Sequence, residues 1–231
     1  MSVPRMNVVL AHGAWADGSS WSKVIGPLKD RGHNVVAAPL PLSSMPEDIA
    51  ALERVIERMN ATVILVGHAY AGAVIAATRS ERVGALVYLA GLAPDEGETV
   101  AEVFYRVEPH PLAPTLAPDD HGLIWLPDSA FASSFAPHAS AAEQIVLAAV
   151  QRPIHAGCIA VKMGRPLWRD RPAWYLLAEQ DRMIKAETQA FMAGRMRATV
   201  RSQPLDHMPS VSAPETVVDI IVEAARAADR P

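Results

Sequence analysis

The stretch TVILVGHAYAGAVIAAT, residues 62–78, decides the fold of this chain. Residues 63–66 are β-branched or aliphatic and predict a buried strand that ends at Gly67. The chain then turns, and a run of small residues suited to a helix follows. A strand, a sharp turn and a helix in this order are the context of a nucleophile elbow, whose motif is G-x-S-x-G.

This elbow lacks its serine. Gly67 fits the first position of the motif, Ala71 stands where the second glycine is expected, and Gly72 follows it. Small residues are needed there because the strand and the helix pack closely behind the turn. The middle position is Ala69, and a methyl group cannot attack a carbonyl carbon. The chain is therefore either a hydrolase that has lost its nucleophile or a protein whose function needs no serine.

Length and composition favour one α/β domain with an insertion. The chain has 231 residues, half of them hydrophobic, and a formal charge of −4, which argues against a nucleic acid or an acidic membrane as partner. A small-molecule substrate is the better expectation, with room for a homodimer. The single cysteine, Cys158, excludes an intrachain disulfide, and no apolar stretch reaches the roughly 18 residues of a membrane span. We expect a cytoplasmic protein.

Strand and helix patterns alternate along most of the chain, which predicts an α/β fold with a mainly parallel sheet and helices on both faces. Capping-box spacing of Ser44 with Glu47, and of Ser212 with Glu215, marks two helix starts. The alternation breaks down where prolines and aromatic residues gather. We therefore expect a core of residues 1–93 and 171–231 and an inserted lid of residues 94–170. The strands are expected at 7–11, 34–38, 63–66, 85–90, 173–178 and 199–202, and helices at 19–30, 44–59, 140–150, 187–196 and from 212 onward.

Three expected strand ends present Ala69, Asp181 and His207, in the chain order of a hydrolase triad. In parallel sheets the loops at the carboxyl ends of the strands build the site. Asp181 would accept a hydrogen bond from one ring nitrogen of His207, and the other nitrogen would face the cavity as a base. The Tyr70 N–H and an N–H of the loop 12–15 would hold a developing oxyanion.

Some of these residues have simpler interpretations. Asp181 could be an acid at a helix N-terminus, and His207 could be an exposed loop histidine. Asp95 is a rival acid, although the string PDEGE around it favours a solvated turn. The four histidines expected in the lid, at positions 110, 121, 138 and 155, lack metal-ligand spacing, so we expect no metal and no cofactor. Cys158 has no basic neighbour in sequence and is expected to be inert core.

The lid aromatics jointly predict an apolar pocket, and we take Phe104 and Trp125 as substrate-binding residues. His12, in the string HGAW, is interpreted as a structural residue or one that gates the lid, and we include it among the substrate-binding residues. His68 is expected to fix the surroundings of the elbow.

Six blocks of this sequence resemble, in order, the blocks of α/β-hydrolase-fold proteins, closest to the small-lid esterases that group with plant methyl esterases and hydroxynitrile lyases. They are VVLAHGAWADGSSW (8–21), RGHNVVAAPLPL (31–42), LVGHAYAGAVI (65–75), ALVYLAGLAPDEGE (85–98), YLLAEQDRMI (175–184) and DHMPSVSAPE (206–215). The resemblance covers nearly the whole core, whereas the lid between the blocks is not specific to this group.

By position, the resemblance implies a nucleophile at Ala69, an acid at Asp181 and a base at His207. It places the oxyanion donors at Tyr70 and at Ala14 or Trp15. The sequence departs from the family pattern at Ala69 and, less seriously, at Ala71.

Three hypotheses follow. The first is an esterase for a small apolar ester or lactone, inactivated by a serine-to-alanine change at position 69 that is either natural or introduced by mutation. The second is a serine-free lyase, decarboxylase or water-activating enzyme in which His207 and Asp181 act as general base or acid, similar to plant methylketone synthases that carry alanine at the elbow. The third is a non-catalytic ligand-binding protein that has kept the pocket.

Overall fold

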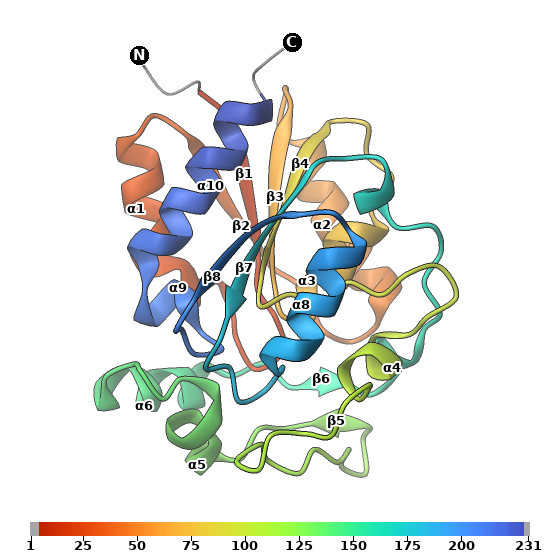
Figure 1. Ribbon diagram of the computed structural model, residues 1–231, viewed down its shortest axis with the longest axis vertical. Coiled ribbons are helices and arrows are strands. Elements are labelled where there is room, and N and C mark those ends of the chain that lie inside the picture. Colours follow the sequence, from red (N-terminus) through yellow and green to blue (C-terminus); the bar gives the residue numbers. More distant parts are fainter. Residues whose placement is uncertain (1–4, 229–231) are drawn as a thin grey trace.

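A six-stranded parallel sheet forms the centre of the computed structural model, which describes residues 5–228 (Figure 1). The strand order is β2-β1-β3-β4-β7-β8, and each neighbouring pair is parallel. The predicted α/β fold class is confirmed. The strands are β1 (Asn7–Ala11), β2 (Asn34–Ala38), β3 (Val63–His68), β4 (Val83–Leu89), β7 (Ala173–Ala178) and β8 (Thr199–Gln203).

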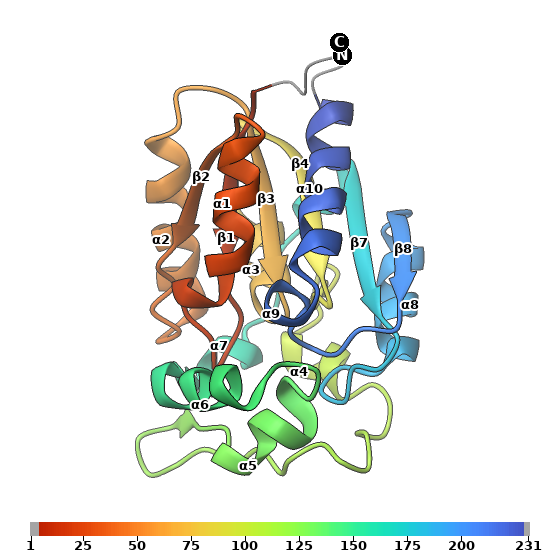
Figure 2. The same ribbon diagram turned by 90° about the vertical axis from the view of Figure 1, so that its left-hand side faces the viewer.

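Helices cover both faces of this sheet, which is why the inner strands β3, β4 and β7 are nearly continuous apolar runs, whereas the edge strand β8 is polar and mostly exposed. On β1, Val8 and Leu10 pack with the α1 and α10 side, and Val9 and Ala11 pack with the opposite side. Figure 2 shows α1 and α10 in front of the sheet, with α2 and α3 behind it. The helices are α1 (Ser22–Asp30), α2 (Met45–Glu57), α3 (Ala71–Ala77), α8 (Ala186–Arg195), α9 (Pro209–Ser212) and α10 (Pro214–Ala228), and a 3-10 turn, Gly18–Trp21, precedes α1.

The segment between β4 and β7 pairs its two short strands with each other, apart from the main sheet. Its helices α4, α5 and α6 lie beyond the carboxyl ends of the parallel strands (Figures 1 and 2). This is the place at which open parallel sheets bind ligands. The elements are α4 (Val100–Phe104), β5 (Leu123–Ile124), α5 (Asp128–Ala130), a π-helical turn Phe131–Phe135, α6 (Ala141–Val150), β6 (Ile154–His155), α7 (Gly157–Ala160) and a 3-10 turn Leu167–Arg169.

One predicted helix start is wrong. Ser212 ends α9 instead of capping α10, and its hydroxyl donates to the Asp206 carboxylate at 2.7 Å. The carbonyl of Ala213 accepts the first hydrogen bonds of α10. The loop that carries His207 thus uses the serine that the capping box requires. Ser44, by contrast, does cap α2 by accepting from the Glu47 N–H.

Close packing between β3 and α3 explains the glycines of the elbow. A Cβ at Gly67 would lie 2.7 Å from the carbonyl oxygen of Ala71, and one at Gly72 would lie 2.6 Å from that of Leu92. The second crowded position is therefore Gly72, so that alanine fits at position 71.

Of the helices in the described part of the chain, none combines the length and hydropathy that a membrane span needs.

We expect Gly67→Ala to destabilise the fold by about 1–3 kcal/mol, because the added methyl group overlaps backbone atoms that cannot move independently. Gly194→Ala is the matched control, since a Cβ there meets no atom within 4 Å and the residue lies in α8. It should raise stability by about 0.5–1 kcal/mol through helix propensity. Urea unfolding of both variants measures the two effects, and equal effects would contradict the packing argument.

Candidate active site

The turn after β3 holds Ala69 in a left-handed conformation with φ 48°. For an L-residue other than glycine this costs roughly 1–2 kcal/mol. Three backbone hydrogen bonds fix the turn: the Ala69 N–H donates to the Leu89 carbonyl, and the Ala69 carbonyl accepts from Gly72 and Leu92. The sharp, strained elbow expected from the sequence is present, with a methyl group at its tip.

Asp181 and His207 form a buried hydrogen-bonded pair beside this turn. Asp181 follows β7 and His207 follows β8, and the distance from His207 Nδ1 to Asp181 Oδ2 is 2.8 Å. Both residues are about 2–3% exposed. Because the carboxylate only accepts, Nδ1 carries the proton and Nε2 is left as the free ring nitrogen.

The Asp181 carboxylate has donors on both oxygens. Oδ1 accepts from the backbone N–H groups of Met183 and Ile184 at 2.7 and 2.9 Å, and Oδ2 also accepts from Gln189 Nε2 at 3.0 Å. The interpretation of Asp181 as an acid at a helix N-terminus is wrong, because α8 begins only at Ala186 and the two N–H groups belong to the bend before it. Sequence reasoning missed Gln189, whose signal is an amide on the buried face of an amphipathic helix.

Of the N–H groups expected as oxyanion donors, those of Ala14 and Tyr70 have no hydrogen-bond partner within residues 5–228. Both residues line the cavity that Ala69 and His207 also line. The N–H of Trp15 instead donates to the Arg152 carbonyl at 2.9 Å. The alternative that placed an oxyanion donor at Trp15 is therefore corrected, because that N–H is already taken.

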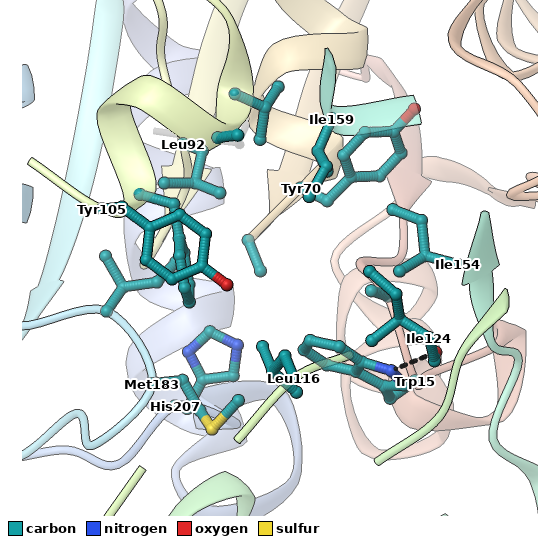
Figure 3. Close-up of a pocket in the computed structure, with 16 residues that line it drawn as sticks. Trp15, Tyr70, Leu92, Tyr105, Leu116, Ile124, Ile154, Ile159, Met183 and His207 are labelled. Atoms are coloured by element: carbon teal, nitrogen blue, oxygen red, sulfur yellow. Dashed lines mark hydrogen bonds between the residues drawn. The ribbon is translucent and has the colours of Figure 1, made fainter. Parts of the chain in front are cut away.

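The cavity above the elbow has a volume of about 560 Å³ including its open mouth, and its lining is almost wholly apolar (Figure 3). Phe104 lines it, and its role in substrate binding stays a prediction. Two polar side chains of the lining form hydrogen bonds within the protein: the Trp15 indole N–H donates to the Ile124 carbonyl, and the Tyr70 hydroxyl donates to Asp48. His207 is the one lining side chain that becomes a cation on protonation.

Two predicted substrate-binding residues lie elsewhere. Trp125 is 49% exposed and its indole N–H donates to Asp119. Side chains alternate along a strand, so the inward-facing Ile124 at the end of β5 sends its neighbour outward. His12 is buried outside the lining, with Nδ1 at 3.0 Å from the Gly13 carbonyl oxygen, and burial lowers its pKa.

The sequence did not single out most of the cavity wall, because isoleucine, leucine and methionine carry no signal that separates a cavity from a core. These residues include Leu116, Ile124, Ile154, Ile159 and Met183; Tyr105, one of the lid aromatics, also lines the cavity.

Asp95 is not a rival to Asp181. Its carboxylate pairs with the Arg169 guanidinium at 2.7 and 2.8 Å, near the surface, and this pairing lowers the pKa of Asp95 against the opposing effect of desolvation. The Cys158 thiol is buried, which raises its pKa to about 11. Within residues 5–228 no three His, Cys, Asp or Glu side chains gather as metal ligands would.

His68 supports the loop that carries His207. Its Nε2 donates to the His207 carbonyl at 2.7 Å, and the two rings lie 4.8 Å apart. Burial, followed by the neighbouring His207, lowers the pKa of His68 to about 3. His68 therefore stays neutral and places no competing positive charge beside His207.

The chain belongs to the alpha/beta hydrolase family, whose model matches residues 8–220. No curated protein matches the chain.

Solved structures with the same fold include polyneuridine aldehyde esterase, with a TM-score of 0.82 and 18% identity over 95% of this chain and 99% of that one. A pyrethroid hydrolase from Sphingobium faniae has a TM-score of 0.79 and 20% identity over 97% and 98%. A histidine-to-alanine variant of tomato methylketone synthase I, solved with beta-ketoheptanoate, has a TM-score of 0.84 and 18% identity over 98% and 100%.

Replacing Ala69 by glycine should raise the free energy of unfolding by about 0.5–1 kcal/mol. Glycine removes the left-handed strain, but it also increases the conformational entropy of the unfolded chain, which offsets part of the gain. Ala190→Gly is the control: it makes the same change at an exposed position within α8 and should cost about 1 kcal/mol. Urea unfolding compares the two. A loss of stability in both variants would show that the turn is unstrained.

Stability should fall on acidification, partly through His68. Its pKa is about 3 in the folded chain and roughly 6.5 when unfolded, so its contribution is complete above pH 6.5 and is lost as the unfolded state takes up a proton. His68→Gln, which keeps a donor for the His207 carbonyl, should reduce the slope of unfolding free energy against pH by up to about 1.4 kcal/mol per unit between about pH 6 and 4. Urea titrations at several pH values measure this slope, and equal slopes would refute it.

Proposed function

We propose that this chain is a serine-independent enzyme that activates a small apolar carbonyl compound through His207 and Asp181. The observation that carries the proposal is that the hydrogen-bonded pair and the two unpartnered N–H groups of Ala14 and Tyr70 stand around one cavity with Ala69. A base, an orienting acid and an oxyanion site are therefore assembled, and only a nucleophile is missing.

A reaction that passes through an enolate can use these parts without a nucleophile. In the decarboxylation of a β-keto acid, the bond between the α carbon and the carboxyl carbon breaks and CO2 leaves. The electron pair moves into the enolate, whose oxygen would lie between the N–H groups of Ala14 and Tyr70. Nε2 of His207 takes the proton of the substrate's carboxyl group beforehand and delivers it to the α carbon once CO2 has left, so that the imidazole returns to its starting state.

The cavity favours this class of reaction. Its apolar lining disfavours a localised carboxylate charge, and loss of CO2 spreads that charge over the enolate. The methylketone synthase structure that shares the fold holds a β-keto acid, which makes this compound class the first to test. General acid–base catalysis contributes roughly 10²–10⁴ in rate, which suits a substrate that is already labile.

A second candidate function is ester hydrolysis that has been lost with the serine. The retained strain at Ala69 favours it, because a nucleophile elbow needs such a turn to expose its side chain. The substrate would be a small apolar ester or lactone. This candidate predicts binding of an ester without turnover, since loss of a triad serine lowers turnover about a millionfold.

The deciding experiment compares the chain, Ala69→Ser and His207→Gln on β-keto acids, p-nitrophenyl esters and lactones, with products identified by mass. We expect the unmodified chain to turn over a β-keto acid and His207→Gln to lower that turnover by about 10²–10⁴. His121→Gln is the control, since it changes an exposed histidine of the segment 94–170 and should leave turnover unchanged.

Hydrolysis of esters by Ala69→Ser alone, with an inactive parent chain, would replace the proposal by the esterase candidate. Turnover that survives His207→Gln would contradict the role of His207. Binding without product in every variant would contradict both functions and leave a ligand-binding protein.

A further inference from the structure

Asp48, in α2, is a buried carboxylate that the chemistry above does not use. It is fully buried, and the structure records no ion pair for it in the described part of the chain. Its Oδ2 accepts from the Tyr70 hydroxyl at 2.7 Å and its Oδ1 from the Leu42 N–H at 2.7 Å. A buried carboxylate is costly unless donors satisfy it, and here a tyrosine of the elbow supplies one of them.

Tyr70 connects this carboxylate to the proposed oxyanion site. Its N–H is one of the two unpartnered donors, and its ring forms part of the cavity wall. In Figure 3 the hydroxyl points away from the cavity. The ring is therefore held at both ends, by the turn at Ala69 and by Asp48, and the backbone N–H has little freedom to rotate.

The second hydrogen bond of Asp48, from the Leu42 N–H, reaches a loop that contacts other parts of the cavity wall. Leu42 has a left-handed backbone with φ 60°, and its carbonyl accepts from the His155 N–H at 2.9 Å and the Cys158 thiol at 3.3 Å. The neighbours of these two residues, Ile154 and Ile159, line the cavity. One carboxylate thus ties the elbow to the segment 94–170.

We propose that Asp48 is a positioning residue that aims the Tyr70 N–H at the oxyanion through the Tyr70 hydroxyl. This inference rests on the proposed function, since it requires an oxyanion between Ala14 and Tyr70. Hydrogen bonds weaken steeply as donor and acceptor lose alignment. A Tyr70 ring that is no longer held by Asp48 would let the Tyr70 N–H turn, which would weaken binding of an anion and leave apolar packing nearly intact.

The test uses ligands and needs no turnover. p-Nitrophenolate carries an oxyanion on an apolar ring, and p-nitrotoluene is its neutral counterpart. Their dissociation constants are measured by calorimetry at a pH at which nitrophenol is ionised. For Tyr70→Phe and for Asp48→Asn we expect the phenolate to bind about tenfold more weakly, and nitrotoluene to change by less than about twofold. The double variant should lose no more than either single variant, because both act through one hydrogen bond.

Tyr175→Phe is the matched control. It removes a buried tyrosine hydroxyl that donates to the Gly91 carbonyl at 2.7 Å, outside the cavity lining. We expect it to leave the ratio of the two dissociation constants unchanged. An equal loss in Tyr175→Phe would overturn the proposal, because general loosening would then explain the effect. Equal weakening of both ligands in Tyr70→Phe, or independent losses in the double variant, would also overturn it.

The outcomes separate this inference from the function on which it rests. A parent chain that does not prefer the phenolate to nitrotoluene would lack the oxyanion site, and then both the proposed function and the role of Asp48 would be wrong. A parent chain that prefers the phenolate, with variants that keep the preference, would overturn the role of Asp48 alone.

Discussion

The left-handed backbone of Ala69 is the constraint on which the rest of this site depends. The turn can exist only because Gly67 and Gly72 let β3, α3 and the Leu92 backbone approach within contacts that a Cβ would block. It sends the chain from the sheet into α3 and leaves the N–H of Tyr70 as the first unpartnered donor of that helix. The carboxyl ends of β7 and β8 then bring Asp181 and His207 to the same edge of the sheet.

A buried polar pair must be satisfied, and the surrounding loops are built for this. Backbone N–H groups and Gln189 satisfy Asp181, so the histidine can rotate away only by leaving a carboxylate one donor short. His68 holds the backbone of His207 from the other side and is kept neutral by burial. The orientation of the imidazole is therefore fixed from two sides, by the Asp181 carboxylate and by the neutral His68 ring.

The sequence predicted the core well because its signals are local. Runs such as 173–178 are apolar on both faces, which occurs in parallel sheets covered by helices, and the structure places β7 at those residues. Positions 69, 181 and 207 each follow an expected strand of a parallel sheet, which indicated that they lie at the same edge of that sheet. The predictions that failed were overturned by particular hydrogen bonds and one orientation: the Ser212 hydroxyl donates to Asp206, the Trp15 N–H donates to the Arg152 carbonyl, and Trp125 points outward after β5. No spacing in the sequence encodes these pairings.

The strain at Ala69 bears on why the turn persists without a serine. A left-handed alanine costs roughly 1–2 kcal/mol, and a glycine at this position would avoid most of that cost. Besides exposing the side chain at position 69, the turn determines the direction of the Tyr70 N–H, because that direction follows from the backbone conformation of Ala69. A rigid alanine restricts that direction more than a glycine would, since glycine has access to more backbone conformations. If the site works by stabilising an oxyanion, a strained alanine is therefore a better residue for the elbow than an unstrained glycine, and the absence of serine leaves this part of the machinery intact.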